Sequence, residues 1–519
     1  KASDPPRASG VHHHLFPKSH HRDMTASASS GAVAGPHLLV LPFPAQGHII
    51  PLLHLCHRLA LHGLSLTLLV TPLNRPILAP LLSSHPASVR TLLLPIPPHP
   101  SLPTGVENVS QLGNRGAACF IAALSSLADP IADWFSSHPS PPIAILSDFF
   151  MGWTVSLAAR LSVPRIAFFT SGPFFASIYD RLWRLHNSAD ARSLPVISFP
   201  DLPRSPSLPY HHLPSTFLRY RESDPDFQIV RECMLANASS WGCVFNTFEA
   251  IEGEYMEHLR AERYGEGRVY GVGPLALTTE EGLRLDSSSG MGSDPMAWLD
   301  GCPDGSVLYV CFGSQKLLSG AQMEAVGSAL ERCGSRFVWV VKPGTADQRA
   351  EGIGAVPPGL EDRAAGRGVV VSGWAPQVAM LNHRAVGWFL SHCGWNSALE
   401  AIGAGVAVLG WPMEAEQFVN ARLMADQLGA AVVVWEGADA VPDAAGAREP
   451  HRGGDARGRG AEGGGGAAEG CGGGGGGEGR ELARGLGGAR EGSGSTQNPA
   501  GGGWSLKING GGNGFCSTY

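Results

Sequence analysis

Short apolar runs alternate with longer amphipathic segments along most of the chain. In the first half, the apolar runs lie at 37–43, 64–70, 91–96, 143–148 and 165–170. The segments 49–63, 115–136 and 152–161 between them have the pattern of helices. Continuous apolar strands separated by helices predict a parallel, doubly wound α/β sheet that is buried on both faces.

A second series of the same kind follows a polar, Gly-rich stretch. Its apolar runs lie at 306–313, 336–341, 369–374, 386–391, 406–411 and 430–435. We therefore predict two Rossmann-like domains that face each other across a cleft, at 36–275 and 301–442, with a linker at 276–300. The Pro-, Ser- and His-rich segment 195–226 is expected to be a long loop that shapes a binding pocket.

Both ends of the chain depart from this pattern. Residues 1–35 lack the apolar core of a secretory signal and are expected to be a disordered leader or tag. Residues 443–519 are of low complexity and rich in Gly. Such a segment buries too little apolar surface to offset its ordering entropy, so we predict a disordered tail or the product of a reading-frame error.

Composition narrows the class of protein. A length of 519 residues favours two domains, and a net charge of −7 argues against a nucleic-acid partner. No apolar run reaches the ~18–20 residues of a membrane helix. The ten cysteines show no CxxC spacing and several lie in apolar runs, so a reduced, cytoplasmic setting is expected.

Two polar residues end strands of the first predicted sheet. His48 follows the first strand in FPAQGH, and Asp148 ends the strand IAILSD. An Asp that accepts from one imidazole nitrogen makes the other nitrogen a better base for a hydroxyl proton. The alternative, about equal on position alone, is that His48 and Asp148 only cap the helices that follow.

The stretch SHCGWNSALE ends a strand of the second sheet and begins a helix. His392, Asn396 and Ser397 would surround the free N–H groups of that helix, which favour a phosphate. Glu400 could accept from a ribose diol. A nucleophilic role for Cys393 is disfavoured because neighbouring side chains on a strand point to opposite faces, and zinc is disfavoured because no further Cys or His follows at short spacing.

Weaker signals lie in the same predicted domain. Trp374 ends a strand and could stack on a base, Glu416 and Gln417 begin a helix and suit sugar hydroxyls, and Ser314 follows Gly313 in a turn after a strand. Together with the preceding stretch they outline sites for a base, a ribose, a diphosphate and a sugar.

Residues 374–417 resemble the 44-residue signature box of plant secondary-product UDP-glycosyltransferases, from its first Trp to its last Gln. The segments 43–51, 145–150 and 310–314 are similar to other landmarks of that family. The stretch PPHPSLPTGVENV (97–109) resembles the branch that acts on flavonoids and related phenolics of plant secondary metabolism.

The resemblance implies a GT-B fold and an inverting hexosyltransferase that moves glucose from UDP-glucose to a hydroxyl of a small phenolic acceptor. It implies that His48 is the base and Asp148 its partner. It further implies that the UDP-sugar is held by Ser314, Trp374, Ala375, Gln377, His392, Trp395, Asn396, Ser397, Glu400, Glu416, Gln417 and Thr170.

The resemblance also implies a monomer without metal or cofactor, whose ligands are the UDP-sugar and the acceptor. Two departures accompany it. Glu416 stands where Asp is commoner in the family, and nothing after Pro442 resembles the family's closing helices. A catalytically impaired or inactive family member is therefore the alternative reading.

Overall fold

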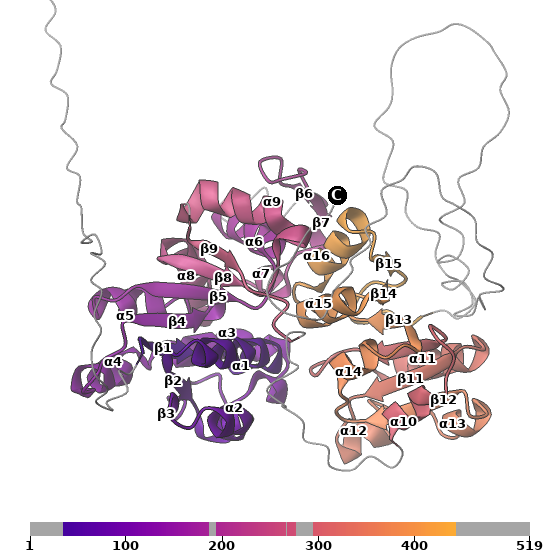
Figure 1. The fold of residues 1–519 in the computed structure, drawn as a ribbon. Helices are drawn as coiled ribbons and strands as arrows, with labels where there is room; N and C mark the ends of the chain where they lie inside the picture. The colour runs from indigo at the N-terminus through magenta and orange to yellow at the C-terminus, as the bar shows by residue number, and fades with distance from the viewer. Residues whose placement is uncertain (1–34, 186–193, 266, 277–293, 443–519) are drawn as a thin grey trace, which may run out of the picture.

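The computed structural model describes residues 35–185, 194–265, 267–276 and 294–442 (Figure 1). The predicted tail, and the predicted leader except for residue 35, lie outside these ranges, as does most of the predicted linker. Among the described residues, no single helix has both the length and the apolar character to cross a membrane. The bent pair α3 and α4 (Ala117–Ser125 and Ala128–Ser137) meets these criteria by length and composition only.

The N-terminal part forms a seven-stranded, fully parallel sheet in the order β3-β2-β1-β4-β5-β8-β9. The central strands are almost wholly buried because helices cover both faces, as their continuous apolar runs predicted. The strands are β1 (His37–Leu41), β2 (Ser65–Val70), β3 (Val89–Leu93), β4 (Ala144–Asp148), β5 (Arg165–Phe169), β8 (Gly242–Phe245) and β9 (Val269–Gly271).

The C-terminal part forms a six-stranded parallel sheet in the order β12-β11-β10-β13-β14-β15. In both sheets the second and third strands add on one side of the first strand, and the later strands add on its other side. This is the strand order of a Rossmann fold. The strands are β10 (Val307–Cys311), β11 (Arg336–Val341), β12 (Gly368–Ser372), β13 (Val386–Ser391), β14 (Ala407–Gly410) and β15 (Ala431–Val433).

The remaining helices pack on these sheets (Figure 1). On the N-terminal sheet they are α1 (Gln46–Leu61), α2 (Ala79–Ser84), α5 (Thr154–Arg160), α6 (Pro173–Leu185), α7 (Ser215–Leu218), α8 (Pro225–Ala236) and α9 (Glu249–Leu259). In the C-terminal part they are α10 (Pro295–Asp300), α11 (Gly320–Arg332), α12 (Ala346–Ala350), α13 (Leu360–Arg363), α14 (Gln377–Leu381), α15 (Trp395–Ala404) and α16 (Gln417–Arg422).

The structure differs from the predicted elements in a few places. The predicted helix at 115–136 is the pair α3 and α4, bent by 42°. The strands β8 and β9, four and three residues long, were not predicted. The predicted loop at 195–226 contains a short hairpin, β6 (Val196–Ser198) and β7 (Ser207–Pro209), together with α7 and the start of α8.

The two parts meet through loops at the carboxyl ends of their strands. The Trp395 indole donates to the backbone oxygen of Asn246, which follows β8, at 2.8 Å. The Asn396 amide donates to the backbone oxygen of Gly47, in the first turn of α1, at 3.1 Å. The first turn of α15 therefore lies against the loop that carries His48.

Candidate active site

His48 and Asp148 form a hydrogen-bonded pair at the reversal point of the first sheet. Because β1 and β4 are parallel neighbours, the residues that follow them meet at one edge. The Nδ1 of His48 lies 2.8 Å from Oδ2 of Asp148, and the Asp148 side chain is fully buried. A carboxylate oxygen accepts, so Nδ1 carries the proton and the Nε2 lone pair is free to accept one.

Asp148 combines the two roles that its position alone left open. Its Oδ1 accepts from the Phe150 N–H at 2.8 Å and caps the short helix η4 (Phe149–Met151), while its Oδ2 holds His48. Capping therefore fixes the carboxylate in the orientation that the imidazole requires.

A buried cation that sequence reasoning missed lies behind Asp148. The Arg165 guanidinium donates to the Asp148 backbone oxygen at 3.1 Å and to the Ser147 hydroxyl at 2.9 Å. Burial lowers the pKa of Arg165 to about 10, against the raising effect of nearby groups that include Asp148, so it stays charged at neutral pH. An Arg opening the otherwise apolar strand RIAFF was the available signal.

The pKa of His48 reflects opposing influences. Burial lowers it, whereas the charge of Asp148, the hydrogen bond to it and the charge of Glu416 raise it, and the net shift is upward. The ring is stacked on Phe150 and Phe149, with centroids 4.9 and 5.6 Å away, and the edge of Phe43 closes a third side. The imidazole is thus a strengthened base held in an aromatic setting.

Thr170, at the end of β5, lies close to this pair. Its hydroxyl is 3.4 Å from the Nδ1 of His48, and the residue is buried. The structure therefore brings the predicted sugar contact from the N-terminal domain to the His48 ring.

His392 occupies the corresponding reversal point of the second sheet, after β13. A Cβ on Gly313 would lie 2.7 Å from its Nε2, and a Cβ on Gly394 would lie 2.5 Å from the same atom. The ring therefore fits only between two glycines. Burial lowers the pKa of His392 to about 4, and its buried Nδ1 has no hydrogen-bond partner among the described residues. The ring is neutral, so one of its nitrogens carries an N–H.

Cys393 is a packing residue in this turn. It is fully buried, and burial raises the pKa of its thiol to about 12. Its φ of 63° lies in the left-handed region, and the turn is held by a hydrogen bond from its N–H to the Ser391 hydroxyl and one from the Asn420 amide to its carbonyl. A thiol in this state is a poor nucleophile.

The turn leads directly into α15, whose N-cap is Gly394 without a side-chain cap. Asn396 and Ser397 occupy the second and third helical positions, as predicted for a phosphate-binding helix start. Ser314 lies exposed in the turn after β10, the strand that borders β13. These residues lie at the same edge of the sheet.

A hydrogen-bonded group links the remaining predicted donor-site residues. The Gln377 amide donates to the Ser397 hydroxyl at 2.9 Å and to Glu400 Oε2 at 2.7 Å, and accepts from the Tyr309 hydroxyl at 3.3 Å. Burial raises the pKa of Glu400 to about 7. Beside this group, Ala375 is buried whereas Trp374 is 45% exposed. An exposed indole next to buried acceptors is suited to stacking on a planar ring.

The loop before α16 faces His48. Burial raises the pKa of Glu416, and the charge of His48 opposes that shift, which places the carboxyl near the imidazole. The side-chain oxygen of Gln417 accepts from the Met413 and Glu414 N–H groups at 2.9 and 3.0 Å. Its oxygen thus shapes the loop, and its amide NH2 remains to meet a ligand.

Asn246, like Arg165, is a site residue that sequence reasoning did not identify. It is buried, accepts from Trp395 through its backbone and from the Leu275 N–H through its side chain, and its amide lies 3.5 Å from Asn396. A polar residue at the end of a strand was the signal, but β8 itself was not recognised in the sequence.

The fold and site define a class. Two parallel sheets of Rossmann order, one carrying a His–Asp pair and the other an open helix start and an exposed indole, match the GT-B glycosyltransferases, and the predicted fold class is confirmed.

Comparison with known proteins shows the family to which this chain belongs. The model of "UDP-glucoronosyl and UDP-glucosyl transferase" matches residues 286–447. UDP-glycosyltransferase 89B2 of Stevia rebaudiana is 46% identical over 417 residues, which cover 79% of this chain and 87% of that protein. Flavonol 3-O-glucosyltransferase UGT89B1 of Arabidopsis thaliana is 45% identical over 78% of this chain and 85% of its own length.

The solved structure of Arabidopsis thaliana UGT89C1 complexed with UDP-L-rhamnose has a TM-score of 0.63 and 36% identity, and the match covers 79% of this chain and 87% of that one. The chain belongs to the plant family 1 UDP-glycosyltransferases. It is a glycosyltransferase, as the sequence predicted.

Proposed function

We propose that the chain transfers glucose from UDP-glucose to a hydroxyl of a small phenolic acceptor such as a flavonoid, with inversion at the anomeric carbon. The observation that carries the proposal is the His48–Asp148 pair, which lies against the open start of α15 through the Asn396–Gly47 contact. A base and a phosphate-binding helix start are the two parts that such a transfer needs.

In the proposed step, Nε2 of His48 takes the proton of the acceptor hydroxyl as its oxygen attacks the anomeric carbon. The glycosidic bond to the diphosphate breaks, and UDP leaves with the bonding electrons. Asp148 stabilises the imidazolium that forms. Negative charge on the leaving diphosphate is met by the N–H groups of α15 and by the neutral His392, with Ser314, Asn396 and Ser397 as further donors.

We further propose that fixed donors supply this stabilisation without a metal ion or cofactor. Trp374 stacks on uracil, with the Ala375 backbone and Gln377 beside the uridine, and Glu400 accepts from the ribose. Trp395, Glu416, Gln417 and Thr170 hold the sugar. The contacts of Gln377 with Ser397 and Glu400 support this arrangement, because they place the uridine and phosphate residues together.

Relatives support a UDP-sugar and a phenolic acceptor, and they bear on the choice of sugar. Structures of UGT89C1 are complexed with UDP-L-rhamnose and with quercetin. A flavonol 7-O-rhamnosyltransferase of Arabidopsis thaliana is 37% identical, whereas the flavonol 3-O-glucosyltransferase UGT89B1 is 45% identical. The higher identity favours glucose. The rings of Phe43, Phe149 and Phe150 around His48 suit an aromatic acceptor.

A catalytically impaired protein is the second candidate. The sequence favours it at one place, where the Gly-rich segment after Pro442 does not resemble the sequence of the family's closing helices. The test is incubation with UDP-glucose and with UDP-rhamnose over a panel of phenolics, read by the mass gain of the product.

Unfolding with and without UDP helps to separate the two candidates. A ligand at 100 times its Kd adds about 2.7 kcal/mol to the free energy of unfolding. Stabilisation together with product supports the proposed enzyme. No stabilisation by UDP overturns it for this chain, and stabilisation without product supports the impaired protein.

A further inference from the structure

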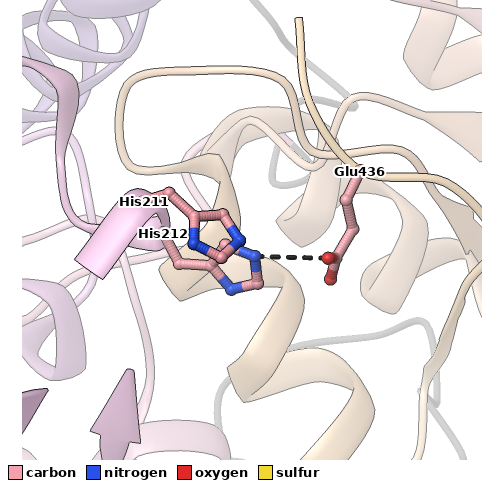
Figure 2. A group of neighbouring side chains, drawn as sticks. All are labelled: His211, His212 and Glu436. Carbon is pink, nitrogen blue, oxygen red and sulfur yellow. Dashed lines mark ion pairs between the residues drawn. The ribbon is translucent and has the colours of Figure 1, made fainter. Parts of the chain in front are cut away.

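Three metal-binding side chains meet away from the site described above. His211 and His212 end the short helix η6 (Tyr210–His212) in the N-terminal part, and Glu436 follows β15 in the C-terminal part. One potential ligand atom from each lies within 4.8 Å of the other two (Figure 2). This group could not be predicted because Glu436 lies more than two hundred positions after the two adjacent histidines.

The central member is a buried imidazole with unmet hydrogen-bonding capacity. His212 is 3% exposed, and its Nδ1 has no hydrogen-bond partner among the described residues. Its Nε2 lies 3.2 Å from Glu436 Oε2, within ion-pair distance but outside hydrogen-bond geometry. Nε2 likewise makes no hydrogen bond to a described residue, and a cation bound to it would remove the cost of leaving that atom buried without a partner.

Packing fixes the ring of His212 while its neighbours remain free to adjust. His212 stacks on Phe418 of α16 with centroids 4.5 Å apart, and the His211 ring stands edge-on to it at 4.3 Å. His211 and Glu436 are both exposed. Ligand atoms on one tetrahedral zinc lie roughly 3.4 Å apart, given Zn–N bonds of ~2.0–2.1 Å. Small rotations of the His211 and Glu436 side chains would therefore bring the three ligand atoms to the separations that one zinc ion requires.

The ligand types suit a metal, because imidazole nitrogens and a carboxylate oxygen bind divalent cations. The charge of Arg422 acts on Glu436, but it does not belong to the ligand set.

We propose that His211, His212 and Glu436 bind one zinc ion, with water completing its coordination, and that this ion joins the two domains. Two imidazoles and one carboxylate are ligands that zinc takes, with an open position for water. The ion lies away from His48 and plays no part in the proposed transfer step.

The position of the ion would affect the loop that contains Glu416. Three residues after His212, the Ser215 N–H donates to the Ala415 backbone oxygen at 3.3 Å, and Ala415 precedes the Glu416 that faces His48. Arg219 also lies 3.4 Å from Glu414. A zinc ion at this seam would hold the Glu416 loop against the N-terminal part.

The test uses the full chain, stripped with a chelator, in a background where the leader histidines 12–14 and 20–21 are replaced by Ala, because they could bind metal on their own. Zn²⁺ is titrated by calorimetry, and unfolding temperature is measured with and without it. The variants are His211→Ala and Glu436→Gln, which change exposed side chains. The matched control is His383→Ala, whose ring pairs with Asp300 at 3.1 Å within the C-terminal part.

We expect one Zn²⁺ per chain in the parent and the control, a raised unfolding temperature, and an affinity at least about tenfold lower in both site variants. Co²⁺ in place of zinc should give a tetrahedral spectrum without a thiolate band. Equal Zn²⁺ affinity in the parent and both site variants, no stoichiometric binding by the parent, or a thiolate band would each overturn the proposal.

Discussion

Each of the two sheets has a histidine at the point where its strand order reverses, His48 after β1 and His392 after β13, yet the two rings have opposite properties. His48 and His392 both lie beyond the carboxyl ends of strands that border the reversal of their sheet. Burial lowers the pKa of both. At His48 the buried Asp148 reverses the shift, whereas at His392 nothing opposes it and the pKa falls to about 4.

The difference shows that the groups packed around the ring decide what a histidine near a strand reversal can do. A carboxylate makes His48 a base that can accept and hold a proton. Burial keeps His392 neutral and two close glycines leave room for its ring, so it can offer an anion an N–H but no positive charge. Each of the following predictions alters one side of this contrast.

The largest effect is expected from removing the base. His48→Ala should lower kcat by about 10³- to 10⁴-fold because no other group replaces the proton acceptor. The Kd for UDP should stay unchanged, since UDP is expected to bind the other sheet. Product formation followed by mass spectrometry and UDP titration by calorimetry check both parts, and full activity in the variant would show that His48 is not the base.

Removing the carboxylate should make His48 resemble His392. Asp148→Asn takes away the two influences that raise the pKa most, so burial dominates and the pKa of His48 falls. The base works only when neutral, so activity is lost as pH falls through its pKa, and this acid limb should move to lower pH. We also expect kcat to fall by about 10²-fold, because the tautomer is no longer fixed. An acid limb at the parental pH would contradict the pairing.

Crowding His392 should weaken donor binding by a smaller amount. Gly394 has an ordinary φ of −63°, so Gly394→Ala introduces only a steric contact with the ring. We expect a loss of about 1–3 kcal/mol in the free energy of unfolding and a Kd for UDP about tenfold higher. The control is Gly301→Ala, where the new Cβ meets only an oxygen at 3.5 Å. If both variants bind UDP equally well, His392 does not require the two glycines.

Much of this architecture could be predicted because it depends on local pattern. Continuous apolar runs are buried on both faces of a parallel sheet, so the fold class followed from their alternation with helices. Polar residues at strand ends, such as His48 and Asp148, could be placed together because parallel strands end at one edge. Their roles in the reaction remain predictions.

What the sequence did not reveal depends on contacts between distant segments. Arg165 behind Asp148, the glycine pair around His392 and the bond from Trp395 to Asn246 arise only when strand order and domain placement are known. The cluster of His211, His212 and Glu436 is of the same kind, since its members come from both domains.

The smallest effect is expected at Cys393, the residue beside His392. Burial raises the pKa of its thiol to about 12, and the sulfur packs where a Cβ on Gly410 would lie 3.0 Å away. Cys393→Ala should therefore cost about 1 kcal/mol in the free energy of unfolding and leave kcat within about twofold. His392→Ala is the informative partner, since losing the N–H donor should raise the Kd for UDP several-fold. A large loss of kcat in Cys393→Ala with unchanged UDP binding would instead mean that the thiol reacts, and the contrast between the two histidines would then need a different explanation.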